Sequence, residues 1–329
     1  MPEHGGRLLA AAQQYGIPAE DWVDLSTGIS PWARVPDEPP ISVWQRLPEE
    51  EDGLMDAAAR YYGTGALLAT PGTQAALQAL PRLRQPGRVA ITKGSYAEHA
   101  AAWRAAGHEV TLLDDHELVD AAETCDAVVV VNPDNPTGRE MRRATLLSLR
   151  AHLAARGGWL VVDEAFVDAH VDTSLAALSG TEGLVVLRSL GKFFGLAGVR
   201  LGFAGMPPAL REAMAAHLGP WAVANPARWA GMGALNDEAW QQQQRERLRE
   251  AGQRLDDLMR QAGLPVTGGT ALFRYSRTDA APLLAHTLAS AGVLVRTFDD
   301  PPALRLGLPA TETAWQRLAN ALPQASTTP

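Results

Sequence analysis

The sequence predicts an α/β protein built around a mostly parallel β-sheet. From residue 67 onward, short apolar runs recur, and most are continuous rather than alternating, as in strands buried on both faces. Ala- and Leu-rich stretches of helical length separate them, which is typical of βαβ units. Polar side chains follow directly after several of the runs. Because ligands of open α/β sheets bind outside the carboxyl ends of the strands, we expect a functional site there.

The region before this alternation is less regular. Residues Leu8–Tyr15 predict a short helix that ends near Gly16, and residues 26–31 form a polar turn that ends in proline. Residues 35–48 are rich in proline and are predicted to be irregular, whereas residues 53–62 predict a helix.

Seven apolar runs are predicted to form the sheet of a large domain: residues 67–70, 88–92, 109–113, 127–131, 160–163, 184–188 and 200–204. Helices are predicted between them, for example over residues 74–80, 97–106 and 143–156. A polar helical segment, residues 238–261, comes later. Two further strands (272–275 and 294–296) with a helix between them predict a small α+β domain at the C-terminus. The expected domains are an arm of residues 1–35 that joins the small domain, a large domain of residues 36–215 and a small domain of residues 216–329.

Composition and charge narrow the classes of function. The formal net charge is −8, with no block of five or more like charges, which disfavours a nucleic-acid partner. Cys125 is the only cysteine, so neither an intrachain disulfide nor a cysteine metal cluster is possible, and we expect no metal site. The N-terminus lacks an apolar signal core, and no apolar run is long enough to span a bilayer. We therefore expect a cytoplasmic protein without a membrane partner.

The segment from Ser189 to Arg200 (SLGKFFGLAGVR) carries the strongest chemical signal. Lys192 follows a strand-like run and is flanked by glycines, a serine and an arginine. Its amine could form a Schiff base with a phosphate-bearing aldehyde, whose phosphate Ser189 and Arg200 could hold. A surface lysine in a glycine-rich loop is the competing interpretation, and the other strand ends decide between the two.

Two further strand ends carry candidate ligands of such a molecule. Gly72 and Thr73 begin a helix after the first strand, where Gly72 permits close approach and Thr73 either binds phosphate or caps the helix. Tyr96 follows the second strand, where it either stacks on a flat heterocycle or closes the edge of the core.

The next two strand ends supply an amide and a carboxylate. Asn135 lies in the rigid turn NPDNPTG, which either aims its side chain at the strand ends or serves only as a turn. Asp163 ends a buried strand, where a carboxylate is costly unless it is paired. A protonated pyridine nitrogen would be a suitable partner; helix capping is the alternative.

Together these motifs resemble the fold-type-I family of pyridoxal-phosphate (PLP) enzymes, which includes the class I and II aminotransferases. The resemblance covers roughly residues 24–308. It is closest to the histidinol-phosphate aminotransferase branch and, more narrowly, to the threonine-phosphate decarboxylases of cobalamin biosynthesis. The N-terminal segments His4-Gly5-Gly6 and DLSTGISP (residues 24–31) indicate the narrower group.

The resemblance implies roles for these residues. Lys192 forms the Schiff base and moves protons, Asp163 pairs with the pyridine nitrogen, Asn135 bonds the ring hydroxyl and Tyr96 stacks on the ring. The cofactor phosphate is held by Gly72, Thr73, Ser189 and Arg200. Asn135 also lies beside the substrate, whose other expected ligands are His4, Thr27, Gly28, Arg296 and Arg305. Arg305 matches the arginine that clamps the α-carboxylate.

The resemblance also implies an activity: decarboxylation of a phosphorylated amino acid, L-threonine O-3-phosphate, by a homodimer. One position departs from the aminotransferase pattern, because Phe166 stands where many relatives have a tyrosine that bonds the ring oxygen. Histidinol-phosphate aminotransferase is the alternative enzyme, and a non-catalytic scaffold that retains the fold is an alternative of another class.

Overall fold

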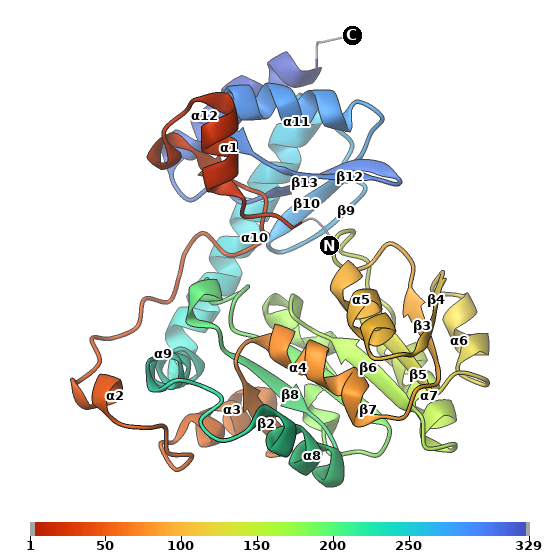
Figure 1. Cartoon of the computed structure of the whole chain (residues 1–329). Helices are drawn as coiled ribbons and strands as arrows, with labels where there is room; N and C mark the ends of the chain where they lie inside the picture. The colour runs from red at the N-terminus through yellow and green to blue at the C-terminus, as the bar shows by residue number, and fades with distance from the viewer. Residues whose placement is uncertain (1–3, 327–329) are drawn as a thin grey trace. The chain divides into compact units, whose positions relative to one another are not determined.

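The seven predicted apolar runs form one seven-stranded sheet in the computed structural model, which describes residues 4–326 (Figure 1). The order across the sheet is β2-β8-β7-β6-β5-β3-β4. All neighbours are parallel except β8, which is antiparallel to both β2 and β7. The strands are β2 (Leu67–Thr70), β3 (Arg88–Thr92), β4 (Glu109–Leu113), β5 (Ala127–Val131), β6 (Trp159–Asp163), β7 (Leu184–Ser189) and β8 (Gly202–Gly205). The prediction of a mostly parallel seven-stranded sheet is confirmed.

Helices cover both faces of this sheet because its central strands are apolar on both sides. Every residue of β5 is buried. Side chains of α4, α5 and α8 join one core cluster with alternate residues of the strands, among them Val129, Val161 and Val185. The helices of this part are α2 (Ser42–Gln45), α3 (Leu54–Tyr62), α4 (Thr73–Ala79), α5 (Ala97–Ala105), α6 (Glu117–Ala121), α7 (Arg143–Ala154), α8 (Pro208–Leu218) and α9 (Asn225–Asn236).

A second, smaller sheet lies in the C-terminal part of the chain, with the antiparallel order β12-β13-β10-β9. The strands are β9 (Gly268–Thr270), β10 (Phe273–Arg277), β12 (Arg296–Asp299) and β13 (Pro302–Gly307). A separate parallel pair joins β1 (Val23–Asp24) to β11 (Val293–Leu294). The helices here are α1 (Leu8–Tyr15), α10 (Glu238–Gln261), α11 (Ala281–Ser290) and α12 (Glu312–Ser326). Short 3-10 turns occupy Ala19–Asp21, Leu80–Leu83, Val167–Ala169, Val171–Thr173, Ala176–Leu178 and Ala197–Val199.

The predicted α+β character of this part is confirmed, but its strands are more numerous than predicted. The single strand expected over residues 294–296 is divided between β11 and β12, which belong to different sheets. β13 was not predicted because it begins with proline and carries Arg305 in a short mixed run. Its pairing with both β10 and β12, rather than its own composition, makes it a strand.

The chain packs as two units. Of the described residues, one unit contains 4–32, 136–138 and 242–326; the other contains 33–135 and 139–241. We call them the small unit and the large unit. Residues 216–241, which the sequence analysis placed in the small domain, belong to the large unit because α9 packs on α3. Among the described residues, no helix is both long enough and apolar enough to cross a membrane.

Candidate active site

A cavity of about 160 Å³ in the large unit collects the side chains predicted to bind a cofactor. Its walls come from the segments that follow β2, β3, β5, β6 and β7. The carboxyl ends of parallel strands meet at one edge of a sheet, so segments far apart in sequence share one space. The predicted residues that line it are Gly72, Thr73, Tyr96, Asn135, Asp163, Ser189, Lys192 and Arg200.

Lys192 and Asp163 face the same cavity. The segment that presents Lys192 is held by the two aromatic residues after it, Phe193 and Phe194, which are both fully buried. The Phe194 ring stacks on Trp240, with centroids 5.7 Å apart and planes 14° apart. Packing of these two rings fixes the backbone next to Lys192, and the Lys192 side chain extends from this fixed backbone into the cavity.

Asp163 is the last residue of β6, and its side chain is almost completely buried. Its Oδ1 accepts a hydrogen bond from the Ala165 backbone N–H at 3.0 Å. Its Oδ2 lies 3.0 Å from Nε2 of the buried His99, so an ionised carboxylate requires this ring nitrogen to be the donor. These partners offset the cost of burying the carboxylate and fix its direction.

Sequence reasoning missed His99, although a signal existed. His99 lies in the first turn of α5, three residues after Tyr96, which is the N-cap residue of this helix. Their rings meet edge to face, with centroids 6.2 Å apart. One imidazole therefore contacts both the predicted stacking ring and the predicted partner of the pyridine nitrogen.

One end of the cavity is suited to a phosphate. Arg200 has a left-handed backbone (φ 57°), a conformation that costs about 1–3 kcal/mol in a residue other than glycine. A Cβ on Gly72 would lie 2.8 Å from Nη2 of Arg200 and would displace the guanidinium, and the left-handed backbone of Gly72 (φ 73°) also favours glycine. Thr73 does not cap α4 with its side chain; its hydroxyl donates to the Arg188 carbonyl at 3.1 Å. The Ser189 hydroxyl accepts the Gly191 N–H at 3.1 Å.

Tyr96 lies at the edge of the same cavity, and its hydroxyl is 3.4 Å from the Gln74 side-chain oxygen. Burial, with the nearby carboxylates Asp163 and Glu98, raises the pKa of Tyr96 to about 12. Its phenol is therefore protonated at neutral pH, and the ring offers a neutral flat surface. Asn135 lines the cavity from the turn after β5.

The residues predicted to bind substrate, apart from Asn135, lie in the small unit. Arg296 on β12 and Arg305 on β13 are direct cross-strand partners. Burial, with Arg296 alongside, lowers the pKa of Arg305 to about 10, so it still carries its charge at neutral pH. Two neighbouring cations, one of them buried, are suited to an anionic ligand because an anion relieves their repulsion.

The N-terminal segment packs on the same part of the small unit. The Ser26 carbonyl accepts a hydrogen bond from Arg305 Nη2 at 2.7 Å, and the Ser26 hydroxyl accepts the Gly6 N–H at 2.8 Å. A Cβ on Gly5 would lie 2.3 Å from the Ser26 carbonyl oxygen, so glycine is required at that position. The polar turn that holds Thr27 and Gly28 thus lies between the His4 segment and the β13 arginine.

A family model confirms what these arrangements indicate. The model for class I and II aminotransferases matches residues 48–322. The chain belongs to the class I and II aminotransferase family.

Known members of this aminotransferase family are similar over nearly the whole chain. A threonine-phosphate decarboxylase from Pseudomonas aeruginosa is 52% identical over 98% of this chain and 97% of its own length. A histidinol-phosphate aminotransferase from Shewanella amazonensis is 32% identical over 88% of this chain and 84% of its own. The crystal structure of histidinol-phosphate aminotransferase from Sinorhizobium meliloti with pyridoxal-5'-phosphate has a TM-score of 0.83. It is 21% identical and covers 99% of this chain and 95% of the solved one.

The cavity of this aminotransferase-family chain fits PLP in charge and shape. Its polar residues divide into a cationic end at Arg200, a carboxylate at Asp163 and an amine at Lys192, which match a phosphate, a pyridine nitrogen and an aldehyde. Apolar side chains separate these groups and suit a flat ring: Leu77, Val131, Ala165, Phe166, Leu196 and Leu201. The described residues contain no group of three or more His, Cys, Asp and Glu side chains that could hold a metal ion.

Phe166 is the departure from the aminotransferase pattern, and the structure places it beside the amine. The Lys192 Nζ lies 5.3 Å from the centroid of the buried Phe166 ring. A phenol at this position would offer a hydrogen bond, whereas phenylalanine offers only the face of its ring to the amine.

Proposed function

We propose that this protein is a PLP-dependent decarboxylase that converts L-threonine O-3-phosphate to (R)-1-aminopropan-2-yl phosphate for cobalamin biosynthesis. The observation that carries the proposal is the single cavity that Lys192 and Asp163 share, with Arg200 at its phosphate-binding end. Family membership and the 52% identity to a threonine-phosphate decarboxylase support the substrate and the reaction.

When bound, PLP supplies an electron-accepting ring that stabilises the charge left on Cα as CO2 departs. The chain's own residues prepare this chemistry. Asp163, held in place by His99, would keep a proton on the ring nitrogen. Lys192 would provide the amine that holds the cofactor and would supply the proton that Cα takes up after CO2 has left. Asn135 would donate a hydrogen bond to the ring oxygen, and Tyr96 would pack against the ring.

The substrate is held by charge in the proposed reaction. Arg305 binds the α-carboxylate through its two-pronged guanidinium, and this contact sets which bond to Cα breaks. Arg296 binds the second anionic group, with His4, Thr27 and Gly28 supplying further contacts. The cross-strand position of Arg296 and Arg305 supports a ligand with two anionic groups.

A product assay tests the proposal. With L-threonine O-3-phosphate and PLP but without an amino acceptor, the wild-type protein should release CO2, and Lys192→Ala should lose nearly all turnover. Equal activity in both proteins would exclude covalent attachment through Lys192. Lys93→Ala is a matched control, because Lys93 follows β3 outside the cavity.

Histidinol-phosphate aminotransferase is the second candidate, favoured by the 32% identity to an enzyme of that name. It requires transfer of the amino group to 2-oxoglutarate. Formation of glutamate from 2-oxoglutarate with histidinol phosphate as the amino donor, without CO2 release from L-threonine O-3-phosphate, would replace the decarboxylase proposal with this one.

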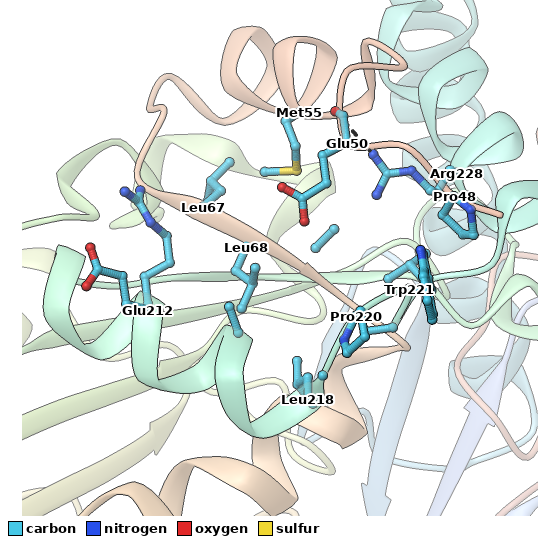
Figure 2. Close-up of a pocket in the computed structure, with 16 residues that line it drawn as sticks. Pro48, Glu50, Met55, Leu67, Leu68, Glu212, Leu218, Pro220, Trp221 and Arg228 are labelled. Carbon is cyan, nitrogen blue, oxygen red and sulfur yellow. Dashed lines mark hydrogen bonds between the residues drawn. The ribbon is translucent and has the colours of Figure 1, made fainter.

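We also propose that the protein is a homodimer that works in the cytoplasm. Large apolar side chains are exposed along one segment of the large unit, where Ile41, Trp44 and Leu47 are each more than 60% exposed. A cavity of about 400 Å³ adjoins the end of this segment, and its lining combines apolar side chains that include Pro48, Met55 and Trp221 with two glutamates and two arginines (Figure 2). Adjacent exposed apolar side chains of this kind mark interaction surfaces, and we propose that a second copy of the chain covers them. Cell fractionation tests the location.

A further inference from the structure

A buried ion cluster lies directly behind the cofactor cavity. Arg188 of β7 is 2% exposed, and its Nη1 donates to Glu164 Oε2 at 2.9 Å and to Ser174 Oγ at 2.8 Å. Its Nη2 pairs with Asp168 Oδ1. Both carboxylates are completely buried. None of these residues lines the cavity.

Most polar atoms of the cluster have partners, as a buried group of charges requires, although Arg188 Nε has none among the described residues. The Leu175 N–H donates to Glu164 Oε1 at 2.6 Å, and the Tyr61 hydroxyl donates to Asp168 Oδ1 at 2.9 Å. The Tyr62 ring covers the guanidinium, with its centroid 4.7 Å from Arg188 Cζ. Burying three charges costs several kcal/mol each, so apolar side chains would serve stability as well or better. A gain in stability therefore does not explain the cluster, and we explain it by the chain segments around the cavity whose positions it fixes.

Two members of the cluster, Glu164 and Arg188, are chain neighbours of residues that line the cavity. Successive strand residues point to opposite faces, so Glu164 and Arg188 point away from the cavity while their neighbours Asp163 and Ser189 face it. The Glu164 N–H donates to the Leu187 carbonyl at 2.9 Å, which ties the two strand ends together.

Two further connections reach the remaining segments. The Arg188 carbonyl accepts the Thr73 hydroxyl at 3.1 Å, which joins the cluster to the phosphate-binding turn. The Tyr61 ring packs on Phe194, two residues after Lys192, with centroids 5.6 Å apart. The cluster thus contacts every segment that presents Thr73, Asp163, Ser189 or Lys192 to the cavity.

We propose that Arg188 is a positioning residue: through Glu164 and Asp168 it sets the spacing of the segments that hold PLP. The inference rests on the proposed cofactor site. Lysine cannot replace it, because a single ammonium group cannot reproduce the fork that bonds two carboxylates at once.

The test compares Arg188→Lys with the wild-type protein in three measurements: the dissociation constant for PLP, the visible circular dichroism of the bound cofactor and the urea midpoint of the cofactor-free protein. Arg188→Lys should weaken PLP binding by about tenfold or more, the scale on which outer partners of bound groups act. It should also reduce the visible dichroism, which reports a fixed orientation of the cofactor. Arg150→Lys is the control, because this arginine of α7 bonds only outside the cluster, to the Glu182 carbonyl.

A purely structural role gives a different result. In that case the urea midpoint falls, while the folded variant binds PLP with unchanged affinity and dichroism, and the proposal is overturned. If Arg188→Lys does not fold, the triple variant R188M/E164Q/D168N removes all three charges together and avoids an unpaired buried charge. Normal PLP binding and dichroism in that variant would also overturn the proposal. A wild-type protein that binds no PLP would instead refute the proposed function itself.

Discussion

At the scale of single residues, the proposed chemistry depends on the hydrogen-bond partners of one carboxylate, that of Asp163. Asp163 is buried at a strand end, where an ionised group needs partners to persist. The partners differ in kind: the Ala165 N–H comes from the local turn, whereas His99 comes from a helix 64 residues away in sequence. The Ala165 N–H lies only two residues after Asp163, whereas His99 reaches the carboxylate only through folding. His99 is therefore the partner that distinguishes Asp163 from other aspartates at strand ends.

Removal of the His99 imidazole should therefore affect both stability and cofactor binding. His99→Leu leaves Asp163 Oδ2 facing an apolar side chain, which should lower the free energy of unfolding by about 1–3 kcal/mol. His99→Gln keeps an N–H donor and should lose less. Urea denaturation and PLP titration measure the two effects. The role assigned to His99 fails if the leucine variant matches the wild-type protein in both.

At the scale of elements, close packing of helices sets requirements that are invisible in a single segment. In α9, a Cβ on Gly231 would lie 2.2 Å from the Leu201 Cδ2 atom and 3.3 Å from Leu54 Cδ1 of α3. A Cβ on Gly233, in the same helix, would meet no atom closer than 3.7 Å. The two glycines have similar local sequence but opposite tolerance for a methyl group.

The pair makes a matched experiment. Gly233→Ala should stabilise the protein by up to about 1 kcal/mol, because alanine favours a helix over glycine. Gly231→Ala gains the same preference but overpacks the contact, at a cost of about 1–3 kcal/mol. Chemical denaturation should therefore rank Gly233→Ala above the wild-type protein and Gly231→Ala below it. Equal stability of the two variants would contradict the close approach of α9.

At the scale of the whole molecule, a single chain does not explain why the large unit exposes the apolar side chains of residues 41–47 to solvent. Trp44 is 63% exposed, and Trp221 is 59% exposed with a left-handed backbone (φ 58°). Strained residues persist where the surrounding structure or a function maintains them. A second copy covering both indoles would account for their position.

We therefore predict a solution mass of two chains of 35.1 kDa each. Trp44→Glu should shift the mass toward that of one chain, because burying a carboxylate in an apolar interface is costly. Leu112→Glu is the control: Leu112 is 42% exposed on β4, at the opposite edge of the sheet from β2. Light scattering after size-exclusion chromatography measures the mass. A wild-type protein that stays a single chain at high concentration would refute the dimer.

The sequence by itself determined the large sheet, because its strands are continuous apolar runs whose burial does not depend on any particular partner. It also predicted the residues that share the cavity, since residues that follow parallel strands must meet at one edge. Asp163 ends one of these strands, and Lys192 follows another.

Tertiary structure alone decided the features that depend on pairing between distant segments. β1 and β13 are strands because of their neighbours, and the predicted strand over residues 294–296 divides because its halves have different partners. The His99–Asp163 contact and the Arg188 cluster join elements far apart in sequence. The reason is physical: burial of an apolar run can be inferred from its own composition, but a buried charge is tolerated only beside partners that folding brings to it.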